Sequence, residues 1–127
     1  MEQQEGKYMT SEKNYSNDKF YDLTTTIAVG QTDSTAIDLS GLELVGFFIP
    51  SNLTATSISI QAAPSSAGTY VVAQDGSGST YSLTVAANKY VPINNFNVVA
   101  GLRFIKLTAG TAQASTDAVI TLAMRSL

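Results

Sequence analysis

The sequence contains no cysteine and no histidine. Without cysteine, the chain can form no disulfide bond and offers no thiol for catalysis or zinc binding. Without histidine, it lacks the side chain that most often serves as a general base or zinc ligand near neutral pH, and a serine nucleophile would have no histidine to activate it. We therefore expect a protein that is not an enzyme and that uses neither a metal nor another cofactor.

Charged residues are also scarce, at 13% of the chain, and the net charge is −3. A nucleic-acid-binding face or a polybasic membrane anchor would need clustered lysine and arginine. No apolar run approaches the roughly 20 residues of a transmembrane helix. The first residues, "MEQQEGKYMTSEKNYSNDKF", lack the basic start and apolar core of a secretion signal. We expect no nucleic-acid partner, no membrane association and synthesis in a cytosol.

The charges that are present gather at the N-terminus, where residues 1–20 hold seven of the seventeen. This stretch has almost no aliphatic residues and shows no helix or strand period. We interpret residues 1–20 as an N-terminal arm without a fold of its own. Its rings, Tyr8, Tyr15 and Phe20, with the adjoining Tyr21, are either incidental to a disordered tail or dock on a partner.

From residue 21 onward, short runs rich in Val, Ile, Thr, Tyr and Phe alternate with Gly, Ser, Asn and Asp. The predicted strands are residues 23–29, 34–39, 39–50, 56–62, 69–74, 79–86, 89–93, 102–109 and 117–127, and no segment predicts a helix. The "DGSG" at residues 75–78 predicts a hairpin. Roughly eight to nine strands at this spacing predict one all-β domain over residues 21–127, an antiparallel β-sandwich of jelly-roll type.

Two of these runs, "LSGLELVGFFIP" at residues 39–50 and "LRFIKL" at residues 102–107, are apolar on both faces. Strict alternation places Phe48 and Phe104 on one face of their strands, which we assign to the core. The predicted core comprises Ile37, Leu39, Leu44, Phe48, Ile58, Ile60, Leu83, Phe104, Ile120 and Leu122. The opposite faces would need a partner to cover them, which predicts a homo-oligomer, with a trimer as the expected form. The predicted interface residues are Tyr8, Tyr15, Phe20, Tyr21, Phe47, Ile49, Ile105 and Leu107.

Three kinds of candidate site each have a simpler structural alternative. A pair of carboxylates for sugar cleavage could come from Asp22, Asp33, Asp38, Glu43, Asp75 and Asp117. Most of these lie beside turns, where Asp commonly binds its own backbone. The "DGSGS" stretch lacks the acidic series of a calcium loop. The tyrosines in predicted strands, Tyr70, Tyr81 and Tyr90, could stack on sugar rings, although packing is their commoner role.

The order of the segments resembles that of the small jelly-roll proteins of tailed-bacteriophage virions, in particular capsid decoration, or cement, proteins. An "AIDLSG" strand and turn lead into "LVGFFIP", "ISIQAAPSSAGTY" precedes the "DG" turn, and "YVPI", "LRFIKL" and an apolar last strand follow. The resemblance runs over residues 24–127 and includes no catalytic motif. It implies a protein on the outer surface of the virion capsid that binds where major capsid protein subunits meet. The alternatives are a head- or tail-fibre module that recognises a host-surface glycan, and an enzyme or lectin-like domain of cellular origin.

Overall fold

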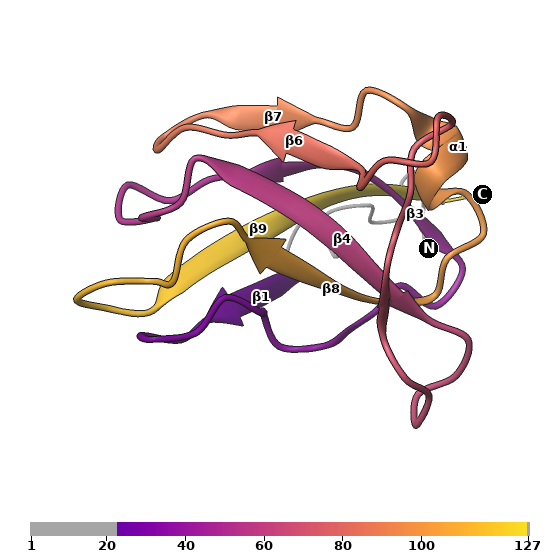
Figure 1. Cartoon of the computed structure of the whole chain (residues 1–127), viewed down its shortest axis with the longest axis horizontal. Coiled ribbons are helices and arrows are strands. Elements are labelled where there is room, and N and C mark those ends of the chain that lie inside the picture. The colour runs from indigo at the N-terminus through magenta and orange to yellow at the C-terminus, as the bar shows by residue number, and fades with distance from the viewer. Residues whose placement is uncertain (1–22, 127) are drawn as a thin grey trace, which may run out of the picture.

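Two antiparallel β-sheets pack face to face in the computed structural model, which describes residues 23–126 (Figure 1). The strands are β1 (Thr24–Ile27), β2 (Ile37–Asp38), β3 (Leu42–Phe48), β4 (Ser57–Ala63), β5 (Val71–Val72), β6 (Ser82–Thr84), β7 (Tyr90–Pro92), β8 (Phe104–Ala109) and β9 (Ala118–Ser126). The predicted all-β sandwich is confirmed, and each predicted run overlaps one of these strands. The expected arm, residues 1–20, lies outside the described residues.

The strand order joins the two halves of the chain. One sheet, the β9 sheet, has the order β1-β9-β3-β7, and the other, the β4 sheet, has the order β2-β8-β4-β5, with β6 also paired to β4. Each early strand has a late partner, because β1 pairs with β9, β2 with β8, β3 with β7 and β4 with β6. Both sheets therefore depend on contacts between residues far apart in the sequence.

One local expectation was wrong, and another was met in part. The helix α1 (Phe96–Val99) forms in a stretch that predicted no helix, and the side chain of its N-cap, Asn95, accepts a hydrogen bond from the backbone N–H of Asn97. The predicted hairpin around residues 75–78 forms, but it is short. Only the isolated bridge between Gln74 and Thr80 joins its two arms, whereas β5 and β6 each pair with β4. The two arms therefore pair with each other only next to the turn. Farther from the turn, both arms pair with β4.

Regular alternation fills the core from both sheets. In β4 and β8, Ile58 lies opposite Ala109 and Ile60 opposite Leu107, and all four side chains are buried. Opposed residues of antiparallel strands project to the same face, so this register supplies one wall of the core. The predicted core residues Ile37, Leu39, Leu44, Ile58, Ile60, Leu83, Ile120 and Leu122 are all buried.

The prediction for β3 was wrong after Leu44, because this strand contains a β-bulge. Leu44 pairs with Met124 and Gly46 pairs with Ala123, so Val45 is an extra residue on β3. A bulge of one residue reverses the faces of every position that follows it. Phe47 and Ile49 are consequently buried in the core and do not form the predicted interface face. Phe48, assigned to the core, is 46% exposed on the outside.

The prediction for β8 was wrong for a different reason. This strand alternates regularly, but its inward face carries Ile105 and Leu107, which are fully buried, and not Phe104. Phe104 is only partly buried and lies opposite Ala63 and Asp38. The sequence offered two apolar faces, and pairing with β4 decided which one faces inward.

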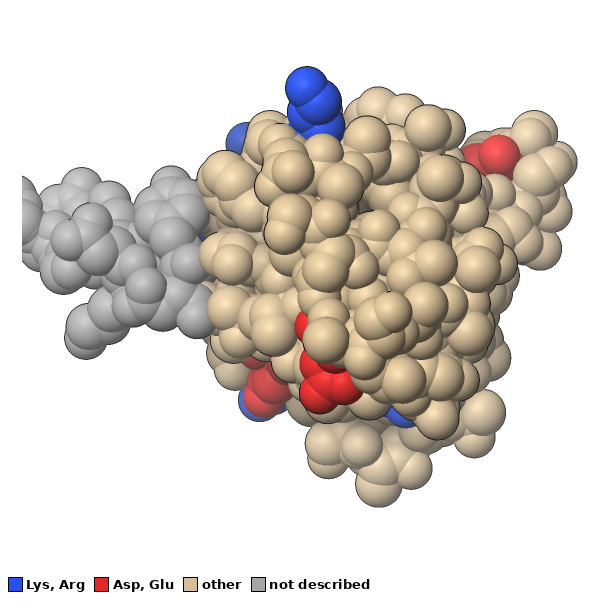
Figure 2. All heavy atoms as spheres, turned by 90° about the vertical axis from the view of Figure 1, so that its left-hand side faces the viewer, with Lys and Arg blue, Asp and Glu red and all other residues tan. Residues whose placement is uncertain are grey.

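A buried amide ties two loops together at one end of the sandwich. The Gln113 side chain is 2% exposed, and its Nε2 donates to the carbonyl oxygens of Asn52 and Thr116 at 2.6 and 3.0 Å. Its Oε1 accepts from the backbone N–H of Thr54 at 3.0 Å. This end of the molecule faces the viewer in Figure 2, where neutral side chains cover most of the surface. The buried polar atoms are satisfied, as the low dielectric of the interior requires.

Because of the bulge, Phe47 is buried and Phe48 is exposed. Truncating the two side chains should therefore have different effects on stability. Phe47→Ala should lower the free energy of unfolding by about 3–5 kcal/mol, as truncation of a fully buried phenylalanine does. Phe48→Ala should lower it by less than about 1 kcal/mol, because that side chain is half exposed. Urea denaturation of both variants measures the two losses, and equal losses would contradict this register of β3.

Candidate interaction surface

Exposed apolar side chains gather on the outer face of the β9 sheet. Phe48 lies opposite Tyr90 on one side and opposite Thr121 on the other, and Thr121 lies opposite Thr24. Because opposed residues share a face, these four side chains form one row across all four strands. Phe48 and Tyr90 are 46% and 45% exposed, so the apolar part of the row is at the surface.

The rows on either side of this one also consist of uncharged residues. Val119, 48% exposed, lies opposite Thr26 on one side of the central row. On its other side, Ala123, Gly46 and Pro92 form a row of small or apolar residues, in which Ala123 and Gly46 are buried. We call this surface the outer β9 face, and its residues are Thr24, Thr26, Gly46, Phe48, Tyr90, Pro92, Val119, Thr121 and Ala123. Since none of these residues is charged, the surface suits contact with another apolar surface.

A glycine keeps the aromatic pair close to the sheet. The rings of Phe48 and Tyr90 have centroids 4.9 Å apart and are tilted by 50°, an arrangement typical of favourable aromatic pairs. A Cβ atom at Gly46 would collide with the Tyr90 ring and would lie 2.7 Å from the carbonyl oxygen of Val91. The missing side chain at Gly46 therefore leaves the space that the Tyr90 ring occupies.

A charged pair lies where β3 and β9 continue beyond these rows. Glu43 lies opposite Arg125, and its Oε1 accepts from the Arg125 Nε at 2.7 Å. The Arg125 guanidinium also lies over the Phe96 ring of α1, 5.2 Å from its centroid. Glu43 is only 7% exposed, and a carboxylate at that burial needs such a partner. The pair limits the apolar surface on this side.

The outer side of the β4 sheet carries more polar groups, although Val72 is 44% exposed on it. Gln61 Nε2 donates to Asp33 Oδ1 at 2.9 Å and to Thr108 Oγ1 at 2.6 Å. The Lys106 ammonium lies 4.6 Å from the centroid of the Tyr70 ring. These polar groups find their hydrogen-bond and cation–π partners within the sheet. This side therefore has less need of a protein partner than the outer β9 face.

An ion pair at the edge of the β4 sheet shifts one pKa. Arg103 donates to both carboxylate oxygens of Asp38, at 2.8 and 3.2 Å. The hydrogen bond from Arg103 is the main cause that lowers the pKa of Asp38 from 3.8 to about 2, and hydrogen bonds from Ser40 add to it while desolvation opposes it. Asp38 therefore stays charged at any pH near neutrality.

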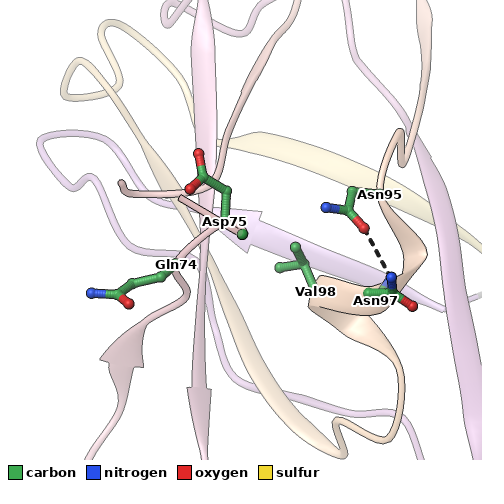
Figure 3. Close-up of a pocket in the computed structure, with 6 residues that line it drawn as sticks. Gln74, Asp75, Asn95, Asn97 and Val98 are labelled. Atoms are coloured by element: carbon green, nitrogen blue, oxygen red, sulfur yellow. Dashed lines mark hydrogen bonds between the residues drawn. The ribbon is translucent and has the colours of Figure 1, made fainter. Parts of the chain in front are cut away.

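An open hollow of about 270 Å³ lies between the turn at residues 75–79 and α1 (Figure 3). It is lined by Gln74, Asp75, Gly76, Asn95, Asn97 and Val98. Asp75 Oδ1 accepts from the Ser77 hydroxyl and from the backbone N–H groups of Ser77 and Ser79, and the Ser77 hydroxyl bond is the main cause of the lowered pKa of Asp75. Gln74, Asn95 and Asn97 bring amide groups to this hollow, and the Asp75 carboxylate is held by its own turn.

The predicted site residues separate into two groups. Tyr8, Tyr15, Phe20 and Tyr21 lie outside the described residues, and Phe47, Ile49, Ile105 and Leu107 are core residues. Sequence reasoning missed Phe48 and Val119 as surface residues. The run "AVITLAM" did carry a signal for Val119, because its apolar residues continue on both faces of the strand. No comparable local signal marks the bulge that exposes Phe48.

The three tyrosines considered as a sugar platform lie apart. Tyr81 is 5% exposed and its hydroxyl donates to Asn94 Oδ1 at 2.7 Å. Tyr70 packs with Lys106 of the β4 sheet, whereas Tyr90 lies on the outer β9 face. They form no shared platform.

The carboxylates considered for sugar cleavage are each held by nearby groups. Asp117 accepts from the backbone N–H of Val29 at 3.0 Å, and Asp33, Asp38, Glu43 and Asp75 have the partners given above. Asp22 lies outside the described residues. Each described carboxylate therefore has a local structural role.

Comparison of the chain with protein-family models, with curated proteins and with solved structures gives no match. Within residues 23–126, no group of three or more His, Cys, Asp or Glu side chains is placed to hold a metal ion. Among those same residues, no helix has the length and apolar character needed to cross a membrane. The outer β9 face is accordingly interpreted from its own chemistry.

The contact between Gly46 and Tyr90 predicts the effect of adding one methyl group. Gly46→Ala should lower the free energy of unfolding by about 1–3 kcal/mol, the usual cost of overpacking, and should shift the ring-proton resonances of Tyr90. Gly76→Ala is the matched control, because a Cβ there meets nothing within 4 Å. Denaturation and NMR spectra measure both effects. An unmoved Tyr90 ring in the Gly46 variant would contradict the contact.

The lowered pKa of Asp38 predicts a stability difference in acid. Because the folded pKa of about 2 lies below the ordinary 3.8, the pair stabilises the fold above about pH 4, and this contribution is lost as the pH falls towards 2. Asp38→Asn should therefore lower the melting temperature slightly at pH 6 and bring it level with the wild type near pH 2. Thermal unfolding at several pH values tests this, and high salt should reduce the difference.

Proposed function

We propose that this protein is a structural component of a tailed-bacteriophage particle that decorates the outer surface of the capsid. In this role it clamps neighbouring major capsid protein subunits, after synthesis in the host cytoplasm. The observation that carries the proposal is the outer β9 face, where Phe48, Tyr90 and Val119 are about half exposed among uncharged neighbours. Apolar and aromatic residues of this kind form the centres of protein–protein interfaces. The resemblance of the segments over residues 24–127 to decoration proteins supplies the identity of the partner.

We infer that the sandwich is a jelly roll. The inference is supported by the strand order, β1-β9-β3-β7 against β2-β8-β4-β5. It is supported also by the pairing of each early strand with a late one, as happens when a long antiparallel ribbon wraps around a barrel-like core. Jelly rolls are common among virus capsid domains but also among lectins. The fold alone therefore fits both the decoration role and its alternative.

The decoration role needs many modest contacts. Contacts on a repeating lattice reinforce one another through effective concentration, so no single contact has to be strong. An uncharged apolar face loses little affinity at high salt, because screening acts on charges. We propose that the protein self-associates, as a trimer, and that the outer β9 face takes part in assembly.

A second candidate function is a head- or tail-fibre module that recognises a host-surface glycan. The observation in its favour is the hollow whose lining includes Gln74, Asp75, Asn95 and Asn97, because amide and carboxylate groups bind sugar hydroxyls. A glycan array probed with the full-length protein tests this candidate. Binding that is lost in Asn95→Ala and retained in Phe48→Ser would favour it over the decoration role.

The decoration role is tested by copy number and position. Quantitative mass spectrometry of purified particles should find this chain in a fixed, high proportion to the major capsid protein. A cryo-electron map should place it on the outside of the head at contacts between capsid subunits. A few copies located on a fibre would instead support the glycan-binding alternative.

Binding to undecorated heads should depend on the exposed aromatic pair. The double variant Phe48→Ser, Tyr90→Ser should bind heads at least about tenfold more weakly, the effect of removing interface residues worth more than about 1.4 kcal/mol. Val72→Ser is the control, since Val72 is 44% exposed on the other sheet. Co-sedimentation of protein with heads measures both. Equal weakening by the two variants would argue against the outer β9 face as a binding surface.

A further inference from the structure

We propose that the N-terminal segment of one copy, residues 1–22, docks on the outer β9 face of a neighbouring copy. This proposal rests on the self-association part of the proposed function and names the surface and the segment that produce it. It requires no capsid. The chemistry of the face, the point where the segment joins the fold and the length of the segment support this contact.

The outer β9 face is suited to contact with uncharged aromatic rings. Phe48, Tyr90 and Val119 offer apolar area, and the residues around them are threonine, alanine, glycine and proline. Residues 1–22 bring four aromatic residues in a stretch that otherwise has few apolar side chains: Tyr8, Tyr15, Phe20 and Tyr21. Aromatic rings bury a large apolar area for little loss of side-chain entropy. The segment and the face are therefore complementary in kind.

The point of attachment lies at the edge of the β9 sheet, level with the Phe48 row. The Leu23 carbonyl accepts a hydrogen bond from the Leu122 N–H at 2.9 Å, so the chain before β1 still runs alongside β9. Thr24 lies opposite Thr121, and the strands are antiparallel, so stepping back along the chain leads towards Arg125. The exposed rows at Phe48 and Val119 lie level with β1 or in the opposite direction. A segment that continued in this direction would pass the row of Ala123 and leave the Phe48 and Val119 rows of its own copy behind.

The segment is long enough for this exchange. A fully extended stretch of 22 residues spans roughly 70 Å, whereas four strands are only about 15 Å across. One segment can thus leave its own sheet and cross the outer β9 face of the next copy. Because the donor segment and the acceptor face differ, the contact is head-to-tail, and such contacts close into a ring when the rotation allows it. A trimer would contain three equivalent contacts of this kind.

Two full-length variants separate the donor from the acceptor. The face variant carries Phe48→Ser and Tyr90→Ser, and the arm variant carries Tyr8→Ser, Tyr15→Ser and Phe20→Ser. Each alone should self-associate at least about tenfold more weakly than the wild type. Mixed together, they should form a one-to-one complex, because the face variant keeps its segment and the arm variant keeps its face. Sedimentation velocity measures the masses, and Val71→Ser with Val72→Ser is the control on the other sheet.

Cross-linking gives a readout that does not depend on affinity. The chain has no cysteine, so Tyr15→Cys in one tagged copy and Thr121→Cys in another can form only intermolecular disulfides. The mixture should yield a Tyr15–Thr121 cross-linked pair. Ser59→Cys, on the outer side of the β4 sheet, replaces Thr121→Cys in the control and should yield far less. Circular dichroism confirms that each variant is folded.

The outcomes distinguish this inference from the proposed function. A monomeric wild type would overturn both the exchange and the proposed trimer. An arm variant that stays trimeric would overturn the exchange alone and would point to direct contact between copies of the face. Monomeric variants that form no complex when mixed, with no cross-link, would show that the segment acts on its own chain. Loss of head binding with the exchange intact would count against decoration only.

Discussion

The extra residue at Val45 controls which side chains of β3 face the core. Leu44 and Phe47 are three residues apart, and regular alternation would place them on opposite faces. With Val45 outside the ladder, both are fully buried, and Glu43 and Phe48 share the opposite face. This single irregularity puts a large ring into the core and leaves the next one at the surface. The exposed row of the β9 sheet depends on it.

The two sheets use their outer sides differently. Hydrogen bonds among Gln61, Asp33 and Thr108 occupy the polar groups of the β4 sheet. The β9 sheet instead exposes Phe48 beside Tyr90, whose ring fits because Gly46 has no side chain. A sandwich whose sheets both face solvent would be expected to be polar on each outer side. The apolar outer side here is the feature that a contact function explains.

The edges of the β9 sheet are less suited to contact than its face. At one edge, Thr35 bonds to β1, with its N–H donating to the Thr26 carbonyl and its hydroxyl accepting from the Thr26 N–H. At the other edge, the short β7 ends in Pro92, which has no N–H to donate. Both features blunt an edge against pairing with another chain. Association through side chains on the face is therefore better supported than strand-to-strand pairing.

The sequence by itself determined the all-β class, the positions of the strands and most of the core. These follow from short-range signals, since alternation of apolar residues and the turn residues between runs are local properties. The tertiary structure decided the bulge at Val45, the inward face of β8 and the exposure of Phe48. Each of these depends on the strand that lies alongside, such as β9 for Gly46 and β4 for Ile105, and those partners are far away in the sequence. A strand that is apolar on both faces has no local property that says which face is inside, because only its pairing decides that.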